Sequence, residues 1–371
     1  MQAELTREVA RLYKKPRYSE LKLLAIYLAA FSALFWSPGA WGENSTTPNN
    51  SEPLQKQAKQ QKPEKKKKRS SKKRKGKKKL VRGNAPCLAW LPPVSSESDK
   101  DNHISTNKAV ILCVHGLGLH NGTWEPFGKA MAKRGYVVYA IDVRGFGSWM
   151  EARGRERVDF ASCLEDVRRT LKVLKRAHKE LPVFILGESM GGAIALRITS
   201  IYPELVDGLI SSVPAGDRFN QTKTSIKVAF HLINDPDKPF NVGEGVVKQA
   251  TKDPELREAW LNDPLARLKL TPRELLQFDR FMKGNRRCAK KIKAKPVLMV
   301  QGSGDKLVRP EGTMELFERL ATTDKKFVLI NEAEHLIFEE NQFSKKDLDL
   351  VDSWIKNHIS RTRNETAKST K

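Results

Sequence analysis

From Lys108 onward, short apolar runs rich in β-branched residues alternate with segments of helical spacing. The apolar runs are AVILCVHG, YVVYAID, VFILGES, VDGLISS, PVLMVQGSGD and KFVLINEAEH. The segments with helical spacing are Trp124–Arg134, Phe160–Glu180, Met190–Ile201, a stretch after Pro310 and Lys346–Ile359. A parallel sheet that is covered by helices on both faces requires continuous apolar strands of this kind. The alternation therefore predicts a doubly wound α/β fold with a mostly parallel sheet.

Residues 214–292 interrupt this alternation with helix-prone sequence that is punctuated by prolines. An insertion between two strands of a regular sheet is most simply an excursion above the carboxyl edge of that sheet, so we expect a helical cap there. Within the cap, the apolar run Ile226–Ile233 contains Phe230 as its largest side chain. This run would line an acyl channel or dip into an interface, although a helix that simply packs on the core has the same pattern.

Residues 1–42 have the layout of a targeting segment. A basic stretch precedes Leu23–Trp36, which is uncharged, apolar and shorter than the ~20 residues that cross a bilayer. Ala40 and Gly42 then supply small residues for cleavage. We expect export, to a periplasm or the medium, with an uncleaved membrane anchor and a buried amphipathic helix as the alternatives. The first two readings place the following domain outside the cytoplasm.

Residues 43–84 form a polar spacer that ends in a lysine-rich tract. The chain carries a net charge of +25, and residues 1–82 hold 22 Lys and Arg against 6 Asp and Glu. Like charges at this density repel, which predicts a disordered linker. Residues 56–82 would attach the protein to an anionic membrane or envelope surface, or serve as a spacer without a partner. Nucleic acid is a disfavoured partner, because no aromatic residue interrupts the tract to stack on bases.

Residues 85–360 are long enough and apolar enough for one large α/β domain, and residues 361–371 are expected to form a flexible tail. The four cysteines are far apart and contain no CxxC pair. This spacing argues against both a disulfide scaffold and a structural zinc site.

The segment Gly187–Gly191 reads Gly-Glu-Ser-Met-Gly and matches the nucleophile-elbow pattern. In that pattern the glycines permit a sharp turn from strand to helix that exposes the serine hydroxyl. Here an apolar strand ends immediately before the motif and a helix-like segment follows it. The context makes Ser189 the candidate nucleophile.

Two partners for Ser189 are expected in the order acid, then histidine, each just past the carboxyl end of a strand. Asp305 follows the run PVLMVQGSG, and His335 follows KFVLINEAE. His115 also ends a strand, but there a histidine more commonly braces the loop. The other histidines lie in expected loops or helices, where surface positions explain them.

A serine hydroxyl becomes a useful nucleophile when a base takes its proton, and a histidine base needs a carboxylate on its other nitrogen. Ser189, His335 and Asp305 therefore form one expected catalytic unit. The oxyanion of the intermediate needs preorganised donors, and the N–H groups of Leu117 and Met190 lie in suitable loops. We expect no metal and no cofactor, because the HExxH spacing and the carboxylate clusters of metal sites are missing.

Four segments together, HGLGLHNGTWEPFGKAMAKRGYVVYAIDVRGFGSW, GESMGGAIAL, KPVLMVQGSGDKLV and INEAEHLIFEE, resemble the monoacylglycerol lipase and lysophospholipase branch of the α/β-hydrolase fold. This branch is also known as the serine aminopeptidase S33-type hydrolase domain. The resemblance covers about residues 85–360. It implies Ser189 as nucleophile, Asp305 and His335 as its partners, and Leu117 and Met190 as oxyanion donors. It also implies that the turn Asp142–Gly147 is a fold element beside the site. The cap segment and the lysine-rich leader are where the chain departs from the family pattern.

The expected function is that of a serine hydrolase that cleaves the ester of a monoacylglycerol or a lysophospholipid through an acyl-enzyme. Two alternatives remain at this point. One is an esterase or amidase for small soluble substrates, which the same residues would serve. The other is a non-catalytic envelope-binding protein that uses the polybasic tract, which the intact serine, acid and histidine disfavour.

Overall fold

The computed structural model describes residues 85–93, 107–214, 216–219, 228, 231–232 and 234–369, with side chains described as far as residue 360. The predicted targeting segment 1–42 and the predicted linker 43–84 lie outside these residues. Most of the run Ile226–Ile233, including Phe230, also lies outside them. In the part of the chain that the structure describes, no helix combines the length and the apolar character needed to span a bilayer.

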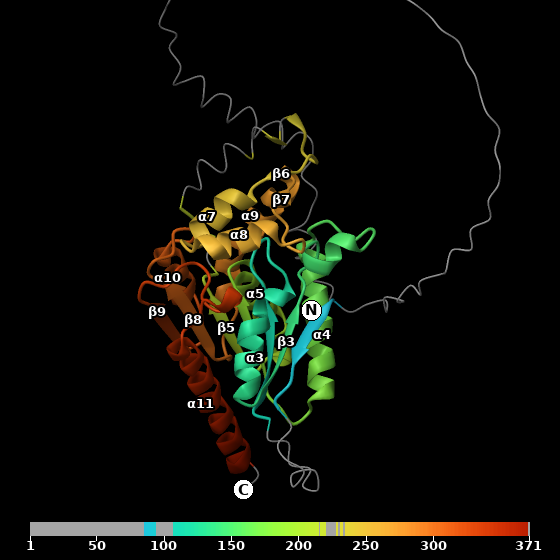
Figure 1. The fold of residues 1–371 in the computed structure, drawn as a ribbon. Coiled ribbons are helices and arrows are strands. Elements are labelled where there is room, and N and C mark those ends of the chain that lie inside the picture. Colours follow the sequence, from blue (N-terminus) through green and yellow to red (C-terminus); the bar gives the residue numbers. More distant parts are fainter. Residues whose placement is uncertain are drawn as a thin grey trace, which may run out of the picture. The chain divides into compact units, whose positions relative to one another are not determined.

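The core of the domain is a seven-stranded sheet with the strand order β1-β3-β2-β4-β5-β8-β9 (Figure 1). Its strands are β1 (Cys87–Trp90), β2 (Ala109–Val114), β3 (Tyr136–Ile141), β4 (Val183–Glu188), β5 (Gly208–Ser212), β8 (Val297–Gly302) and β9 (Lys325–Ile330). Strand β1 pairs antiparallel with β3, and every other pair in this sheet is parallel. The predicted mostly parallel α/β sheet is confirmed.

Burial follows the position of each strand in the sheet. Every residue of β2, β4, β5 and β8 is buried, because helices cover both faces of the sheet at these positions. The edge strands β1 and β9 contain exposed residues instead. Strand β1 was not among the predicted strands, since it is only four residues long and lies before the regular alternation begins.

Helices cover the two faces of the sheet in two groups. One face packs against α3 (Glu125–Lys133) and α11 (Lys345–Ser369), through a core that includes Phe127, Met131 and Trp354. The other face packs against α4 (Phe160–Ala177), α5 (Met190–Ile201) and α10 (Pro310–Glu318), and α9 (Pro272–Ala289) packs on these helices. The predicted doubly wound arrangement is therefore confirmed.

The backbone of α11 remains helical as far as Ser369, across most of the segment 361–371 that is predicted to be a flexible tail. The segment between Ser360 and Ser369 contains neither glycine nor proline. Nothing in its sequence therefore stops the helix once α11 is anchored on the sheet.

The inserted segment between β5 and β8 contains the short ribbon β6 (Phe240–Asn241) and β7 (Lys269–Leu270), together with the helices α7 (Gly243–Ala250) and α8 (Pro254–Asn262). In Figure 1 these helices lie beyond the end of the sheet where the parallel strands terminate. Their apolar side chains, which include Val247 and Trp260, form a small separate cluster with Leu119 and Leu336 from loops of the main domain. Helix α9 also lies within the predicted cap boundaries, but its apolar side chains belong to the main core.

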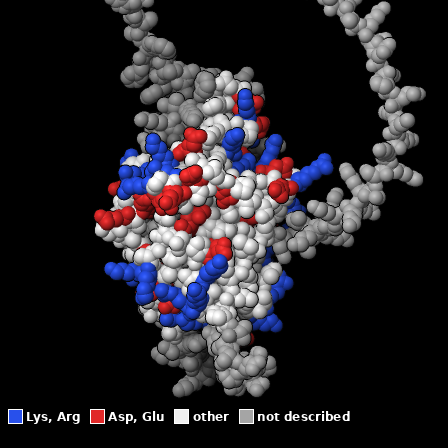
Figure 2. Space-filling view, in the orientation of Figure 1, with Lys and Arg blue, Asp and Glu red and all other residues white. Residues whose placement is uncertain are grey.

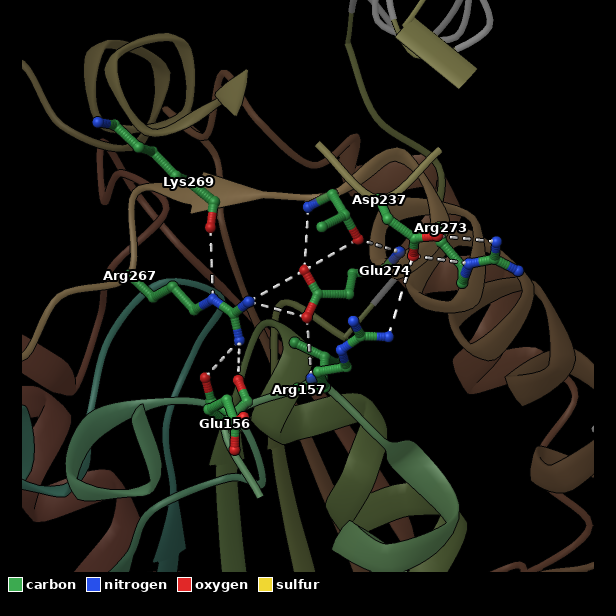
Figure 3. A network of polar contacts seen from close by, with 10 residues as sticks. Glu156, Arg157, Asp237, Arg267, Lys269, Arg273 and Glu274 are labelled. Carbon is green, nitrogen blue, oxygen red and sulfur yellow. Dashed lines mark hydrogen bonds and ion pairs between the residues drawn. The ribbon is translucent and has the colours of Figure 1, made fainter. Parts of the chain in front are cut away.

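A buried ion pair fastens the cap to the core (Figure 3). Arg267, between α8 and β7, donates to the carbonyl oxygens of Gly145 and Glu156 at 2.7 Å each. The same guanidinium lies 2.8 Å from the carboxylate of Glu274, which also accepts a hydrogen bond from the N–H of Val158. Because both side chains are largely buried, the network fixes the start of α9 against the loop that follows β3.

Candidate active site

Ser189 occupies the sharp turn between β4 and α5. Its φ of 53° is rare for a residue with a side chain, and such strain is typical of functional sites. The turn requires glycines on both sides: a Cβ at Gly187 would lie 2.2 Å from the carbonyl oxygen of Gly191, and a Cβ at Gly191 would lie 1.9 Å from that of Val114. The predicted elbow geometry is therefore present.

The structure brings the three predicted reactive side chains together in one hydrogen-bonded chain. His335 Nε2 lies 2.9 Å from Ser189 Oγ, and His335 Nδ1 lies 2.9 Å from Asp305 Oδ2. All three residues are buried, and Ser189 is the most accessible at 8%. An imidazole in this position can take the serine proton while the carboxylate holds its other nitrogen.

Asp305 is fixed by donors of its own. Its Oδ1 accepts hydrogen bonds from the N–H groups of Leu307 at 2.8 Å and Val308 at 2.9 Å, and Gln301 Nε2 donates to Oδ2 at 3.1 Å. Burial alone would raise the pKa of the Asp305 carboxyl, but the charge of His335, the hydrogen bond to it and the N–H groups of Leu307 and Val308 outweigh burial and lower this pKa. Asp305 is therefore held as an anion facing the imidazole.

The pKa of His335 moves in the opposite direction. Burial would lower the pKa of the imidazole, but the charge of Asp305, the hydrogen bond to it and the charge of Glu188 raise the pKa above its ordinary value. The site therefore stabilises the imidazolium that forms when His335 takes the proton of Ser189.

The two predicted oxyanion donors come from two different segments of the chain. Met190 is the first residue of α5, so its N–H has no carbonyl in a preceding helical turn to donate to. Leu117 belongs to the loop after β2 and lines the cavity that contains Ser189. The N–H of the preceding residue, Gly116, donates to Glu339 Oε1 at 2.8 Å, which fixes the direction of this loop.

Sequence reasoning missed two buried glutamates that connect the loops of the site. The carboxylate of Glu188 accepts hydrogen bonds from the consecutive N–H groups of Ile337, Phe338 and Glu339, just after His335. Glu339 in turn holds Gly116 and the hydroxyl of Thr123. Burial and the charge of Glu188 raise the pKa of Glu339 well above its ordinary range. The signal in the sequence was Glu188, a charged residue directly after an apolar strand. Only the tertiary fold shows which groups this carboxylate binds.

His115 has a structural position. Its Nε2 accepts a hydrogen bond from the N–H of Val143 at 2.9 Å, and its Nδ1 lies 2.8 Å from the carbonyl oxygen of Gly116. Burial lowers the pKa of this imidazole to about 4, so the ring is neutral and braces the loop. The neighbouring predicted turn also forms, with Asp142 accepting from the N–H groups of Asn121 and Ser148.

The cap contacts the histidine turn directly. The N–H of His335 donates to the carbonyl oxygen of Ala250 at the end of α7. The carboxylate of Glu334 accepts hydrogen bonds from the hydroxyl of Thr251 and the N–H of Lys252. The cap and His335 are therefore positioned together.

A largely apolar cavity opens at Ser189, enclosed by loops of the core and by the cap. Its lining residues are Gly116, Leu117, Leu119, Ser189, Arg218, Val246, Trp260, Phe278, Met282, Leu307, Val308, His335 and Leu336. Side chains from α7, α8 and α9 thus face the reacting serine. Such a cavity suits an apolar acyl chain.

The family model described as "Serine aminopeptidase, S33" matches residues 105–342, which include every residue of the site. The chain belongs to this family. The predicted α/β-hydrolase resemblance is confirmed by this match and by the relatives that follow.

Several relatives of this S33 hydrolase are lipases by name. A monoacylglycerol lipase of Mycolicibacterium smegmatis is 27% identical over 259 residues, which span 68% of this chain and 89% of that protein. The human monoglyceride lipase is 28% identical over 239 residues, which span 63% of this chain and 78% of that protein.

Solved structures show the same fold. A monoglyceride lipase from Saccharomyces cerevisiae, determined with a substrate analogue, superimposes with a TM-score of 0.61 at 22% identity. The match covers 73% of this chain and 91% of that one. A monoacylglycerol lipase of Paleococcus ferrophilus superimposes with a TM-score of 0.60 at 21% identity, and the match covers 74% of this chain and 99% of that one.

Proposed function

We propose that this protein is a serine hydrolase that cleaves the carboxylic ester of a monoacyl lipid, a monoacylglycerol or a lysophospholipid, through an acyl-enzyme. The observation that carries the proposal is the hydrogen-bonded chain from Ser189 through His335 to Asp305, built at a nucleophile elbow. The named lipases among the relatives support a lipid ester as the substrate.

In the first half of the reaction, Ser189 Oγ attacks the ester carbonyl carbon while His335 Nε2 takes the hydroxyl proton. The N–H groups of Leu117 and Met190 donate to the oxygen that becomes negative. When the tetrahedral intermediate collapses, the bond to the alcohol oxygen breaks. His335 gives its proton to that oxygen, so the alcohol leaves neutral and the acyl group stays on Ser189.

In the second half, water replaces the alcohol. His335 takes a proton from the water as its oxygen attacks the acyl carbon, and the same donors stabilise the second oxyanion. Collapse of this intermediate releases the fatty acid and returns the proton to Ser189 Oγ. The sequence of steps consumes one water and leaves the enzyme unchanged.

The proposal is tested by measuring hydrolysis of a long-chain monoacylglycerol by the full chain and by Ser189→Ala. We expect turnover by the native protein and none above background by the variant, with unchanged circular dichroism. Equal turnover by the two proteins would refute the role of Ser189. Hydrolysis of short soluble esters alone would exclude a lipid substrate.

We further propose that the protein is exported or anchored with its hydrolase domain outside the cytoplasm, and that residues 56–82 attach it to an anionic surface. The composition of residues 1–82 supports this proposal. Figure 2 shows acidic and basic side chains interspersed over the upper part of the visible face of the domain. Because these charges are mixed, we expect the upper part of this face to attract anionic lipid less strongly than the lysine-rich tract does.

A further inference from the structure

Arg218 is the permanently charged side chain among the described residues that line the cavity of Ser189 and His335. It lies after β5, and an isolated antiparallel bridge to Val308 fixes its backbone beside the turn of Asp305. Its side chain is 19% exposed. A guanidinium in an apolar cavity is costly unless acceptors surround it, so its position calls for a partner.

The described residues supply only a weak partner. Arg218 Nη2 lies 4.0 Å from Asp279 Oδ1, which is too long for a hydrogen bond. The other oxygen of Asp279 is 2.8 Å from Lys283 Nζ, so two cations share one carboxylate. The Arg218 Nε–H is buried without an acceptor, and the guanidinium carbon lies 5.3 Å from the centre of the Phe278 ring. Among the described residues, the positive charge of Arg218 is therefore only partly compensated.

A second side chain in the wall of this cavity also has a donor without an acceptor. Trp260, from α8, lines the cavity, and its Nε1–H is buried without a hydrogen bond. Buried donors in folded proteins nearly always have an acceptor. A guanidinium in the wall of a substrate cavity, with its ion partner 4.0 Å away, favours a substrate that brings acceptor oxygens with it.

We propose that the cavity selects a monoacyl glycerophosphate, with Arg218 binding its phosphate. A guanidinium presents paired N–H donors that match two phosphate oxygens. The glycerol of such a lipid separates the phosphate from the ester carbonyl by only a few bonds. One cavity can therefore hold the phosphate at Arg218 and the carbonyl carbon at Ser189. This proposal rests on the proposed function and names the substrate class of the same site.

The test compares kcat/KM for three esters with the same acyl chain: a 1-acylglycerol, its 3-phosphate, and the corresponding 3-phosphoglycerol diester. The native chain should prefer at least one of the two phosphate-bearing esters over the neutral one by at least tenfold. The better of these two identifies the phosphate as a monoester or a diester.

Arg218→Gln should lower kcat/KM for the preferred phosphate ester at least tenfold more than it lowers kcat/KM for the 1-acylglycerol. Arg287→Gln is the matched control. It removes the same charge from an exposed position on α9, outside the cavity lining, and should change none of the values more than twofold.

A native preference for the neutral ester would overturn the proposal, and so would an equal loss for all three esters in Arg218→Gln. If that variant fails to fold, inhibition of the native enzyme decides. Glycerol 3-phosphate should inhibit hydrolysis of a short soluble ester competitively, whereas glycerol should not, and equal effects would overturn the proposal. Failure of the proposed function looks different, because the native chain would then hydrolyse none of the esters.

Discussion

The reactivity of Ser189 depends on the protonation state of His335. The imidazole must be neutral to take the serine proton, and Asp305 raises its pKa above the ordinary value of 6.5. Activity is therefore full above the pKa of His335 and is lost as the pH falls through it. The acid limb of the pH profile of kcat/KM should have its midpoint above 6.5.

Asp305→Asn should lower kcat by roughly 10³ to 10⁴ while the protein stays folded, because the amide favours the wrong tautomer of His335. Without the carboxylate charge, burial dominates and lowers the pKa of the His335 imidazole. The acid limb of the pH profile should therefore move to lower pH. A pH series of ester hydrolysis measures both effects. Near-native turnover in this variant would show that another carboxylate orients His335. Glu334 is the residue to test next, even though its carboxylate is bound to Thr251 and Lys252.

The sequence was sufficient to predict that Ser189, Asp305 and His335 meet, because each follows a strand whose apolar run is easy to recognise. The glutamates Glu188 and Glu339 could not be assigned roles in the same way. Their hydrogen-bond partners are up to 223 positions away in the chain, so only the folded arrangement of three loops reveals them.

At the scale of elements, the contact between β4, α5 and β2 leaves no room for side chains at the elbow. A Cβ at Gly191 would lie 1.9 Å from a backbone oxygen, which cannot move without distorting β2. Gly245 in α7 is the opposite case, because a Cβ there would meet nothing within 4 Å. Replacing each of these two glycines with alanine therefore distinguishes the effect of steric crowding on stability from the effect of helix propensity.

Gly191→Ala should reduce the free energy of unfolding by at least about 3 kcal/mol or prevent folding. Gly245→Ala should leave it unchanged or raise it by up to about 1 kcal/mol, since alanine favours the helix. Urea denaturation measures both. Equal stability of the two variants would mean that the elbow is less tightly packed than the structure shows.

The Arg267–Glu274 pair provides a test of how the cap is anchored. Arg267→Met should cost about 3–5 kcal/mol of unfolding free energy, because it leaves a buried carboxylate without its cation. Arg267→Met combined with Glu274→Gln should recover part of that loss. Arg273→Met, in a half-exposed pair with Asp237, is the control and should cost at most about 1 kcal/mol. Similar losses at Arg267 and Arg273 would show that the network contributes little.

Predictions of elements succeeded where local sequence determines the outcome. The helix Met190–Ile201 begins and ends where its spacing predicts, since the elbow fixes its start. Strand β1 was missed because an edge strand of four residues depends on its pairing with β3 rather than on its own composition. The last turns of α11, after Ile359, were not predicted because the polar composition of this segment is typical of a chain terminus.

At the scale of the whole molecule, the chain combines a hydrolase domain with the strongly basic segment 1–82, whose composition differs from that of the domain. Deleting residues 43–84 should leave kcat/KM for a soluble ester unchanged, because the reacting groups all lie after residue 115. The same deletion should abolish binding to vesicles that contain anionic lipid, and salt should weaken binding of the full chain. Sedimentation with vesicles measures the binding, and binding that persists at high salt after the deletion would refute an electrostatic tether.

The central claim is that Ser189 forms a covalent acyl intermediate. The most direct measurement is mass spectrometry of the full chain after treatment with a p-nitrophenyl alkylphosphonate, which phosphonylates activated serines and cannot be hydrolysed readily. The account predicts one added phosphonyl group, located on the peptide that contains Ser189, and none on Ser189→Ala. Labelling of a different residue, or ester hydrolysis that continues while Ser189 remains unlabelled, would contradict the account.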